Sequence, residues 1–542
     1  MNPLDIDFAT LTDLVRGHAR GAPQRSALID GERRLDYAGL DALLDRVACA
    51  LQRRGVVPGD TIAICAAASI EYVAVFLGAL RAGAAVAPLA PGATPQALRA
   101  MLADAGARWV FVDREVAAQL RPDDAVGSAE GAPAPQLVVL DDAAAAPAFD
   151  TWLAPPGSTP RPVAIVPQAP FNIIYSSGTT GAPKGIVQPH AMRWAHIRRG
   201  AAYGYAASSV TLLSTPLYSN TTLVVLIPTL AFGGCVVLCS KFDAAAYLAL
   251  AQRHRVTHTM LVPVQYQRLM ARADFASYDL TSFQTKFATS APFAAVLKAD
   301  VLARWPGRLI EFYGMTEGGG TCILEADAFP AKLHTVGRPA EGHDIRLIDD
   351  AGREVGAGGA GEVVGHSPGM MSGYHRQPAK TREAEWFDAS GKRFIRTGDV
   401  GRFDGDGFLT LFDRKKDLII SGGFNVYPSD LEDVLRGHPA VADVAVVGVA
   451  SSAWGETPAA FVVPAARLAD EPALTADELQ RWANQRLGKT QRLSHLEFIA
   501  EMPRSAIGKV LKRELRDRFA TSAKTSGDST TGAAGQEAGG SP

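Results

Sequence analysis

The first part of the chain repeats one pattern, a segment with apolar residues at helical spacing and then a short apolar run. Residues 36–55 (DYAGLDALLDRVACALQRRG) have this helical spacing and end at Gly55, and residues 69–83 repeat it. Strand-like runs follow at 61–67 and 84–90. Strands that are joined through helices lie parallel, so the pattern predicts a parallel sheet covered by helices.

The rest of the chain divides by composition. Residues 121–162 are rich in Pro, Ala, Gly and acids, and we expect a surface excursion there. Short Gly-punctuated runs over 337–412 predict antiparallel strands. A chain of 542 residues is too long for one core. We therefore expect an α/β protein with a large N-terminal domain (1–415) of parallel and mixed sheets flanked by helices plus a small antiparallel subdomain, a small α+β C-terminal domain (416–520) and a disordered tail (521–542).

Charge and cysteine content exclude several classes of protein. The net charge of −2 lacks the basic excess that a nucleic-acid binder needs. Five cysteines without paired CxxC spacing indicate neither a disulfide scaffold nor a zinc site, and a cytoplasmic location fits them. The apolar stretch 222–239 is interrupted by Pro228, Gly233 and Gly234, so we expect no transmembrane segment.

The strongest local motif is FNIIYSSGTTGAPKGIVQPH at 171–190. An apolar strand runs into two Ser, two Thr, three Gly and one Lys within ten residues. Exposed backbone N–H groups, hydroxyls and a cation are what a polyphosphate site requires. It is not a Walker A loop, because Gly185 follows Lys184. The alternative is a solvated turn, which this density of donors makes the weaker interpretation.

Four further segments follow in a fixed order: EFYGMTEGG (311–319), RFIRTGDVGRF (393–403), LFDRKKDLIISGGFNVYPSDLE (411–432) and PRSAIGKVLKREL (503–515). Together with the Ser/Thr/Gly motif, this ordered set resembles the adenylate-forming superfamily, which contains AMP-forming acyl- and aryl-CoA synthetases, free-standing adenylation domains and beetle luciferase. The resemblance covers roughly residues 8–518.

The resemblance implies that ATP and Mg²⁺ bind to these motifs. Tyr313 would stack on adenine, Thr316 would hold the α-phosphate and Glu317 would ligate Mg²⁺. Asp399 would accept hydrogen bonds from both ribose hydroxyls, a task suited to a carboxylate. The full set implied for ATP and AMP is Ser176, Ser177, Gly178, Thr179, Thr180, Gly181, Lys184, Ser290, Ala291, Pro292, Glu311, Phe312, Tyr313, Gly314, Met315, Thr316, Asp399 and Arg414.

The resemblance also implies a mobile C-terminal lid. Lys509 would bridge the carboxylate and the α-phosphate and stabilise the charge that builds there. Lys416 sits where the family has its hinge residue. Lys509, Thr316, Glu317 and Lys184 are the implied catalytic residues.

The segment that would hold the acid departs from common family patterns. Many ligases carry His where this chain has Ser219, and Thr289 replaces a common Gly. Gly314 leaves room for a longer or aromatic acid, and Phe312 would add an apolar wall. No acidic residue occurs from 200 to 240, which disfavours an amino-acid substrate. The implied acyl pocket is Tyr218, Ser219, Asn220, Thr221, Val262, Thr289, Phe312 and Gly314.

Two interpretations stay open for the polar residues of the pocket. Asn220, Thr221 and Thr222 would recognise a polar group on the acid, or their side chains would satisfy one another at a buried strand end.

Coenzyme A is the favoured acceptor, because no carrier or condensation domain follows. Glycines permit close approach of a pantetheine arm. The residues implied for CoA are Gly422, Gly423, Phe424, Trp454, Lys489 and Arg492.

We therefore predict an ATP-dependent ligase that activates a medium-chain or aromatic acid to acyl-AMP and transfers it to CoA. The alternatives within the superfamily are a stand-alone enzyme loading a carrier protein and a luciferase-like oxygenase. A nucleotide-sensing pseudoenzyme is a different class, and joint retention of Lys184, Glu317, Asp399 and Lys509 disfavours it. The expected partners are the acid, ATP and CoA, without nucleic acid, and a homodimer is left open.

Overall fold

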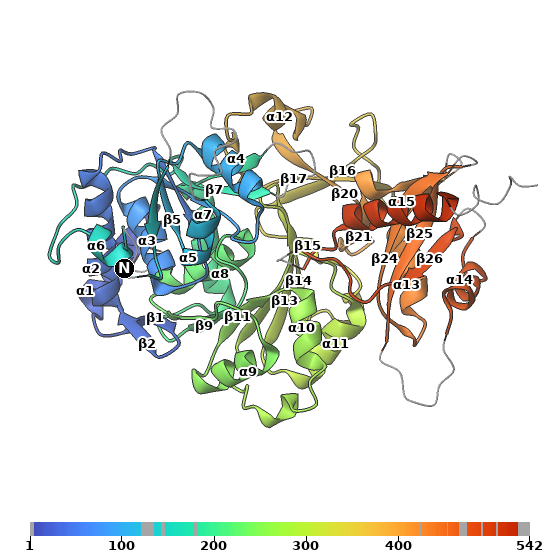
Figure 1. Ribbon diagram of the computed structural model, residues 1–542, viewed down its shortest axis with the longest axis horizontal. Helices are drawn as coiled ribbons and strands as arrows, with labels where there is room; N and C mark the ends of the chain where they lie inside the picture. Colours follow the sequence, from blue (N-terminus) through green and yellow to red (C-terminus); the bar gives the residue numbers. More distant parts are fainter. Residues whose placement is uncertain are drawn as a thin grey trace, which may run out of the picture. The chain divides into compact units, whose positions relative to one another are not determined.

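A computed structural model describes the fold (Figure 1). The residues that it describes are 5–120, 135–142, 147–176, 183–421, 424–451, 454–465, 474–488, 491–505 and 508–528. The chain divides into two compact units. Unit 1 comprises residues 1–359, 363–397 and 403–410, and unit 2 comprises 360–362, 398–402 and 411–542. The predicted domain boundary at 415/416 stays a prediction.

The first large sheet of unit 1 has seven strands in the order β18-β8-β7-β4-β3-β5-β6. Its core is parallel, because β3, β4, β5, β6 and β7 are joined through helices, whereas β7 and β8 form an antiparallel pair. The strand bounds are β3 Thr61–Cys65, β4 Ala85–Pro88, β5 Trp109–Val112, β6 Gln136–Val139, β7 Pro170–Ser176, β8 Lys184–Pro189 and β18 Gly373–Tyr374.

The second large sheet of unit 1 has nine strands in the order β15-β14-β13-β12-β11-β9-β10-β1-β2. The strands from β13 to β1 are parallel, and antiparallel strands close both edges. The bounds are β1 Ser26–Asp30, β2 Arg33–Asp36, β9 Val210–Leu213, β10 Cys235–Leu238, β11 His258–Leu261, β12 Thr285–Ala288, β13 Arg308–Gly314, β14 Thr321–Glu325 and β15 Arg338–Pro339. The helix–strand alternation therefore produces the α/β fold that it predicted.

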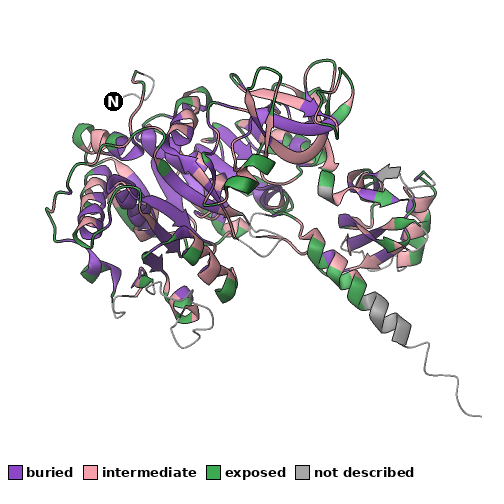
Figure 2. Ribbon diagram, turned by 90° about the horizontal axis from the view of Figure 1, so that it is seen from above, coloured by how far each residue is buried: buried purple, intermediate pink, exposed green. Residues whose placement is uncertain are grey.

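Helices pack on these sheets and form the largest core with them. Helices α2 and α3 approach closely, because a Cβ at Gly78 would lie 2.5 Å from the Val47 side chain. Buried residues are concentrated in the sheets and these helices (Figure 2). The helices of unit 1 are α1 Leu11–Gly21, α2 Tyr37–Arg53, α3 Ile70–Arg81, α4 Pro95–Ala105, α5 Arg114–Gln119, α6 Phe149–Trp152, α7 His190–Gly200, α8 Asn220–Ala231, α9 Ala244–Arg253, α10 Pro263–Met270, α11 Ala295–Arg304 and α12 Pro378–Glu383.

The apolar stretch at 222–239 is buried protein core. It forms most of α8 and then β10, and nearly all of its side chains are buried. None of the helices in the described ranges is long and apolar enough to cross a membrane.

The expectation of a surface excursion at 121–162 is wrong for part of that segment. Residues 136–139 form β6, a parallel edge strand, and α6 carries Trp152 into the core, where it is 2% exposed. The Trp152 ring packs edge-on against Phe111 at 4.9 Å, and the Arg54 guanidinium lies 4.8 Å from its centroid. A helix of four residues is too short to show a periodic apolar pattern. Its Pro-rich and Ala-rich surroundings therefore predicted a loop instead.

Truncating the buried Trp152 side chain should destabilise unit 1. We expect Trp152→Ala to lower the free energy of unfolding by about 3–5 kcal/mol, because it leaves a large cavity. Trp152→Phe is the control. It should cost less than about 1.5 kcal/mol, because the ring remains and the indole N–H has no hydrogen-bond partner among the described residues. Denaturant unfolding followed by circular dichroism measures both, and equal losses would contradict the prediction.

His258 on β11 is fully buried. Its Nε2 donates to the Tyr203 carbonyl at 2.9 Å, and its ring stacks on Tyr205 at 4.3 Å. Burial lowers the pKa of His258 to about 4, against the partly compensating effect of the carbonyl. The imidazole is therefore neutral in the folded protein at pH 7.

The low pKa of His258 makes the free energy of unfolding depend on pH. An unfolded chain binds a proton at His258 near pH 6.5, and the folded chain binds it only near pH 4. Stability from this group is complete above pH 6.5 and is lost as the pH falls through the interval from 6.5 to 4, by about 2–3 kcal/mol at pH 4.5. We expect His258→Gln to lose less stability than wild type between pH 7 and 4.5 in urea unfolding. Parallel losses would show that His258 is not the responsible group.

A smaller five-stranded sheet has the order β16-β17-β20-β19, with β21 paired to β20. Its edge strand β19 pairs antiparallel with β20, as the pattern at 337–412 predicts. The bounds are β16 Asp344–Ile348, β17 Ala360–His366, β19 Glu385–Phe387, β20 Arg393–Phe403 and β21 Leu409–Arg414.

Unit 2 contains its own sheet, in the order β23-β22-β25-β24 with β26 parallel to β25, and its own apolar core. Helix α15 continues to Asp528, and residues 529–542 lie outside the described part, so the disordered tail stays a prediction. The bounds are β22 Ile419–Ser421, β23 Phe424–Val426, β24 Val441–Ser451, β25 Gly455–Pro464, β26 His495–Phe498, α13 Pro428–Arg436, α14 Ala476–Asn484 and α15 Lys512–Asp528.

Candidate active site

Several predicted site residues of unit 1 lie where parallel strands of the nine-stranded sheet end. Strand β12 leads into Thr289 and Ser290, β13 ends at Gly314, and β11 leads into Val262. The turn after β9 reaches Ser219 at the start of α8. Ligands of open α/β sheets bind at the carboxyl ends of the strands, so this edge is the expected place for chemistry.

Hydrogen bonds join these strand ends. Thr289 Oγ1 donates to the Phe312 carbonyl at 2.8 Å, and the hydroxyls of Thr221 and Ser290 lie 2.7 Å apart. Ser290 has a φ of 81°, a strained conformation for a residue with a side chain. The structure thus brings together a residue predicted for the acyl pocket and one predicted for the nucleotide.

The polar residues after Ser219 begin a helix and not a buried strand end, which corrects that expectation. Ser219 is the N-cap of α8 and accepts a hydrogen bond from the Thr221 N–H at 3.2 Å. Thr222 is fully buried and donates back to the Pro216 carbonyl at 2.6 Å. Its hydroxyl is therefore used within the protein.

A second cluster surrounds Glu317. The Tyr374 hydroxyl donates to Glu317 Oε1 at 2.8 Å, and Lys184 Nζ lies 3.9 Å from the same oxygen. Lys184 Nζ also lies 3.8 Å from the centroid of the Tyr374 ring. The Gln377 amide donates to the Pro183 carbonyl at 2.8 Å, which ties the residue before Lys184 to the segment after β18. Lys184 and Glu317, both predicted as catalytic, therefore lie together.

Electrostatics in this cluster follow from partial burial. Burial lowers the pKa of Lys184, and the Glu317 carboxylate opposes that effect. Burial raises the pKa of Tyr374, and Glu317 raises it further, so the phenol stays a hydrogen-bond donor. Lys184 therefore offers a cation to a phosphate, and Glu317 offers an anion to a metal ion.

Among the predicted nucleotide residues that the structure describes, Glu311 differs because it is buried. Its carboxylate pairs with Lys298, which is 2% exposed and donates also to the Leu333 carbonyl at 2.8 Å. Burial raises the pKa of Glu311, while Lys298 lowers it. A direct contact of this side chain with a nucleotide stays a prediction.

Unit 2 carries the remaining predicted residues. Arg414 Nε lies 3.1 Å from Asp399 Oδ1, so these two residues form an ion pair within the unit. The contact of either residue with a ribose stays a prediction.

Lys509 of unit 2 is exposed, and hydrogen bonds hold the backbone beside it. Its N–H donates to Ser505 Oγ at 3.2 Å, and Arg504 forms an isolated antiparallel bridge with Val510. Arg504 donates to the Gly508 carbonyl at 2.7 Å and to Asp443 at 2.6 Å. These contacts fix the backbone that presents Lys509.

Several predicted residues lie outside the described part of the chain. These are residues 177–181, Gly422, Gly423 and Lys489, and the side chains of Ser176, Lys416 and Phe424. Of the other residues predicted for CoA, Trp454 is 53% exposed and Arg492 is exposed. Val262, predicted for the acyl pocket, is 3% exposed.

Sequence reasoning missed Tyr374 and Arg504. Tyr374 reaches Glu317 because β18 pairs with β8, whose first residue is Lys184, and no linear motif signals that pairing. Arg504 stood inside a quoted motif, but its partner Asp443 lies 61 positions earlier. Only the folded chain shows either contact.

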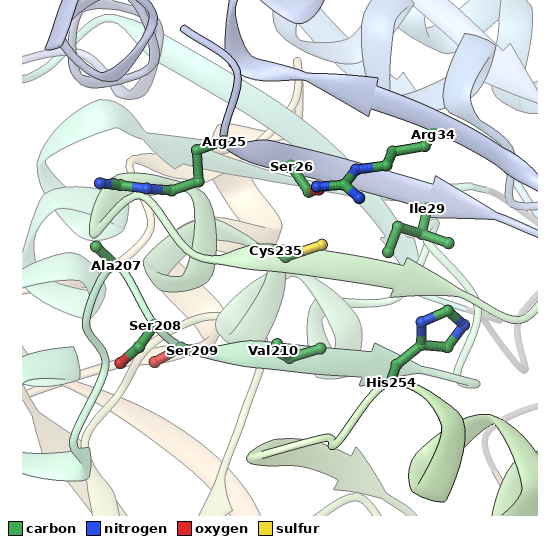
Figure 3. A pocket seen from close by; sticks show the side chains of 10 residues that line it. All are labelled: Arg25, Ser26, Ile29, Arg34, Ala207, Ser208, Ser209, Val210, Cys235 and His254. Atoms are coloured by element: carbon green, nitrogen blue, oxygen red, sulfur yellow. The ribbon is translucent and has the colours of Figure 1, made fainter. Parts of the chain in front are cut away.

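A surface pocket of about 290 Å³ lies elsewhere in unit 1 (Figure 3). Its lining includes Ser26, Val210 and Cys235, the first residues of β1, β9 and β10. This is the amino edge of the parallel strands, opposite the edge where the predicted residues gather. None of the predicted site residues lines it.

Comparison with known proteins identifies the family of this chain. A family model described as AMP-binding enzyme matches residues 15–375, and the model of the AMP-binding enzyme C-terminal domain matches residues 430–509. The chain therefore belongs to the AMP-binding enzymes, the adenylate-forming superfamily that its motifs resemble, and it is an acid–thiol ligase of the AMP-forming acyl-CoA synthetase type.

Three similar proteins span nearly the whole chain. A feruloyl-CoA synthase from Amycolatopsis sp. is 34% identical, covering 92% of this chain and 97% of the relative. An indoleacetate–CoA ligase from Aromatoleum aromaticum is 32% identical and covers 94% and 98%. The solved structure of amide bond synthetase McbA from Marinactinospora thermotolerans has a TM-score of 0.81 and 28% identity, covering 94% and 99%.

Proposed function

We propose that this ligase activates a medium-chain or aromatic carboxylic acid, with an aromatic acid preferred, and transfers it to CoA. The observation that carries the proposal is the aromatic cluster at the end of β13. The Phe312 ring stacks on Phe287 at 5.4 Å and packs edge-on against Tyr203 at 5.6 Å. Gly314 stands exposed two residues beyond Phe312. An aromatic wall beside a position without a side chain suits a flat, apolar acid.

The names of two relatives support the same substrate class. One is a feruloyl-CoA synthase and the other an indoleacetate–CoA ligase, both named for aromatic acids.

In the first half-reaction, a carboxylate oxygen of the acid attacks the α-phosphorus of ATP, and pyrophosphate leaves. Thr316 holds the α-phosphate, and Lys184 with the preceding hydroxyl-rich motif holds the β- and γ-phosphates. Lys509 stabilises the negative charge that builds on the transferring group. Asp399 and Arg414 bind the ribose.

Mg²⁺ fits the residues near Thr316. This ion is commonly bound by one or two carboxylates plus substrate phosphates, and Glu317 supplies one carboxylate. No group of three or more His, Cys, Asp or Glu residues in the described ranges could hold a metal ion by itself, so the phosphates of ATP would complete the coordination. When bound, the ion would neutralise charge on those phosphates.

In the second half-reaction, the thiol sulfur of CoA attacks the acyl carbon, and AMP leaves with the bonding electrons of the broken C–O bond. Residues 422–424 are proposed to admit the pantetheine arm, and Trp454, Lys489 and Arg492 the nucleotide end of CoA. Lys416 is the proposed hinge between the two steps.

A panel of acids tests this proposal. Wild-type protein is incubated with ATP, Mg²⁺, CoA and each of acetate, hexanoate, octanoate, benzoate, ferulate and indoleacetate, and the acyl-CoA product is identified by mass spectrometry. We expect the highest kcat/KM for an aromatic acid. Turnover of none of these acids, or thioester formation with acetate alone, would reject the proposed substrate class.

One observation favours a different acceptor. McbA, the structural neighbour reported above, is an amide bond synthetase. A parallel assay therefore offers an aryl amine in place of CoA. Amide formation without thioester formation would replace CoA as the acceptor and leave the adenylation step intact.

A further inference from the structure

A charged residue that the motifs do not include lies buried beneath the candidate site. Arg193, on α7, is 1% exposed, and its guanidinium meets only neutral groups. Nε and Nη2 donate to Asn172 Oδ1 at 3.2 and 2.9 Å, and Nη1 donates to Asn220 Oδ1 at 2.8 Å. Nη2 also donates to Gln188 Oε1. No ion pair joins Arg193 to a carboxylate within the described ranges.

The cluster extends to the residue assigned to the α-phosphate. Gln188, which is fully buried on β8, donates from Nε2 to the main-chain carbonyl of Thr316 at 2.7 Å. The Asn172 amide donates to Gln188 Oε1 at 2.9 Å. The Gln188 side chain is therefore the link between Arg193 and Thr316.

Arg193 determines which way the Gln188 amide points. A guanidinium only donates hydrogen bonds, so its partner atoms must be acceptors, and the acceptor of a side-chain amide is its oxygen. The Gln188 oxygen must face Arg193, and its NH₂ group must then face Thr316. Without the guanidinium, the Gln188 amide could rotate and turn its oxygen toward the Thr316 carbonyl. Two acceptor oxygens at hydrogen-bond distance repel each other.

A buried cation without a carboxylate partner is costly to retain for stability alone. An apolar side chain at this position would fill the same space among Phe171 and its neighbours, since the guanidinium also lies 5.7 Å from the Phe171 ring. The charge and the donor geometry therefore call for a role beyond packing.

We propose that Arg193 and Gln188 are positioning residues for adenylation: Arg193 orients the Gln188 amide, which fixes the main chain of Thr316 for contact with the α-phosphate. The inference rests on the proposed function, because Thr316 has its phosphate role only there. The same orientation leaves Asn220 with its oxygen toward Arg193, so Asn220 would offer a substrate only its NH₂ donor.

Gln188→Glu tests the orientation. The carboxylate still accepts from Arg193 and now pairs with its charge, but it has no hydrogen to give to Thr316. We expect a lower melting temperature, because a carboxylate oxygen then faces the Thr316 carbonyl, but the new ion pair with Arg193 should keep the enzyme folded. We expect kcat for acyl-adenylate formation, followed by pyrophosphate release, to fall about tenfold or more with a smaller change in the KM for ATP. Thioester formation from supplied acyl-adenylate should change by less than about twofold.

Asn172→Ala is the matched control, because Asn172 contacts Arg193 and Gln188 but not Thr316. The substitution removes the Asn172 oxygen that accepts from Arg193 Nε, so we expect a lower melting temperature. The folded enzyme should form acyl-adenylate within about threefold of the wild-type rate, since Arg193 still orients Gln188.

The two variants thus separate stability from positioning. Adenylation that is unchanged in Gln188→Glu, or both half-reactions slowed equally, would overturn the inference. If Gln188→Glu does not fold, Gln188→Met removes the donor to Thr316 without adding a charge, and the same comparison applies. Failure of the proposed function is recognised separately, because wild type would then form no acyl-adenylate from any acid.

Discussion

Replacing Lys509 by alanine should reduce acyl-adenylate formation by a factor on the order of 10²–10³. Removing one preorganised donor from a charge that develops in the transition state has an effect of this size in other enzymes. Lys509 is exposed, so replacing its side chain should leave the fold intact. Pyrophosphate release with saturating acid and ATP measures the effect.

The same variant should convert supplied acyl-adenylate to acyl-CoA at nearly the wild-type rate, because Lys509 is assigned to the first half-reaction only. Arg513→Ala is the matched control. Arg513 is an exposed cation of α15 close to Lys509 in the chain, and its removal changes the net charge equally. Equal loss in both half-reactions of Lys509→Ala would contradict the assignment, and so would an equal loss in the control.

Filling the space at Gly314 with tryptophan should move the preference among acids toward acetate and propionate. Overpacking costs about 1–3 kcal/mol, which corresponds to a shift of about one to two orders of magnitude in relative kcat/KM. The expectation assumes that wild type prefers medium-chain or aromatic acids. A series from acetate through octanoate, with benzoate, measures both enzymes.

The strand next to Gly314 makes a control necessary. A Cβ at 314 would lie 3.3 Å from the Gly320 carbonyl oxygen and 3.3 Å from Thr321 Oγ1, so any side chain crowds β14. Gly314→Ala introduces this crowding without filling the pocket, and it should lower all rates alike. A wild-type optimum at acetate would show that Phe312 and Thr289 already close the pocket.

The sequence predicted the layers of this fold because burial imposes a period on the chain. Helices α2 and α3 end before glycines with positive φ, Gly55 and Gly83, where the apolar pattern stops. The excursion at 121–162 was misjudged because the anchor, Trp152, stands alone in a short helix. A single buried side chain has no period.

The candidate site was predictable only as far as its residues stand in linear motifs. Lys184 and Glu317 were each found in this way, and the structure brings them together through Tyr374. Arg193 carried no such signal, since a cation on a helix usually faces solvent. Its burial depends on amide partners from β7, β8 and α8, which meet it only in the folded protein.

The contact between Pro183 and Gln377 has a consequence during synthesis of the chain. The two residues lie 194 positions apart. A ribosome adds about 5–20 residues per second, so β8 waits about 10–40 s for β18 to cover its edge. During that interval β8, paired with β7 on one side, presents an open outer edge, which is a template for aggregation. Expression at lower temperature lengthens the wait, and a chaperone that shields this edge would raise the yield of active enzyme.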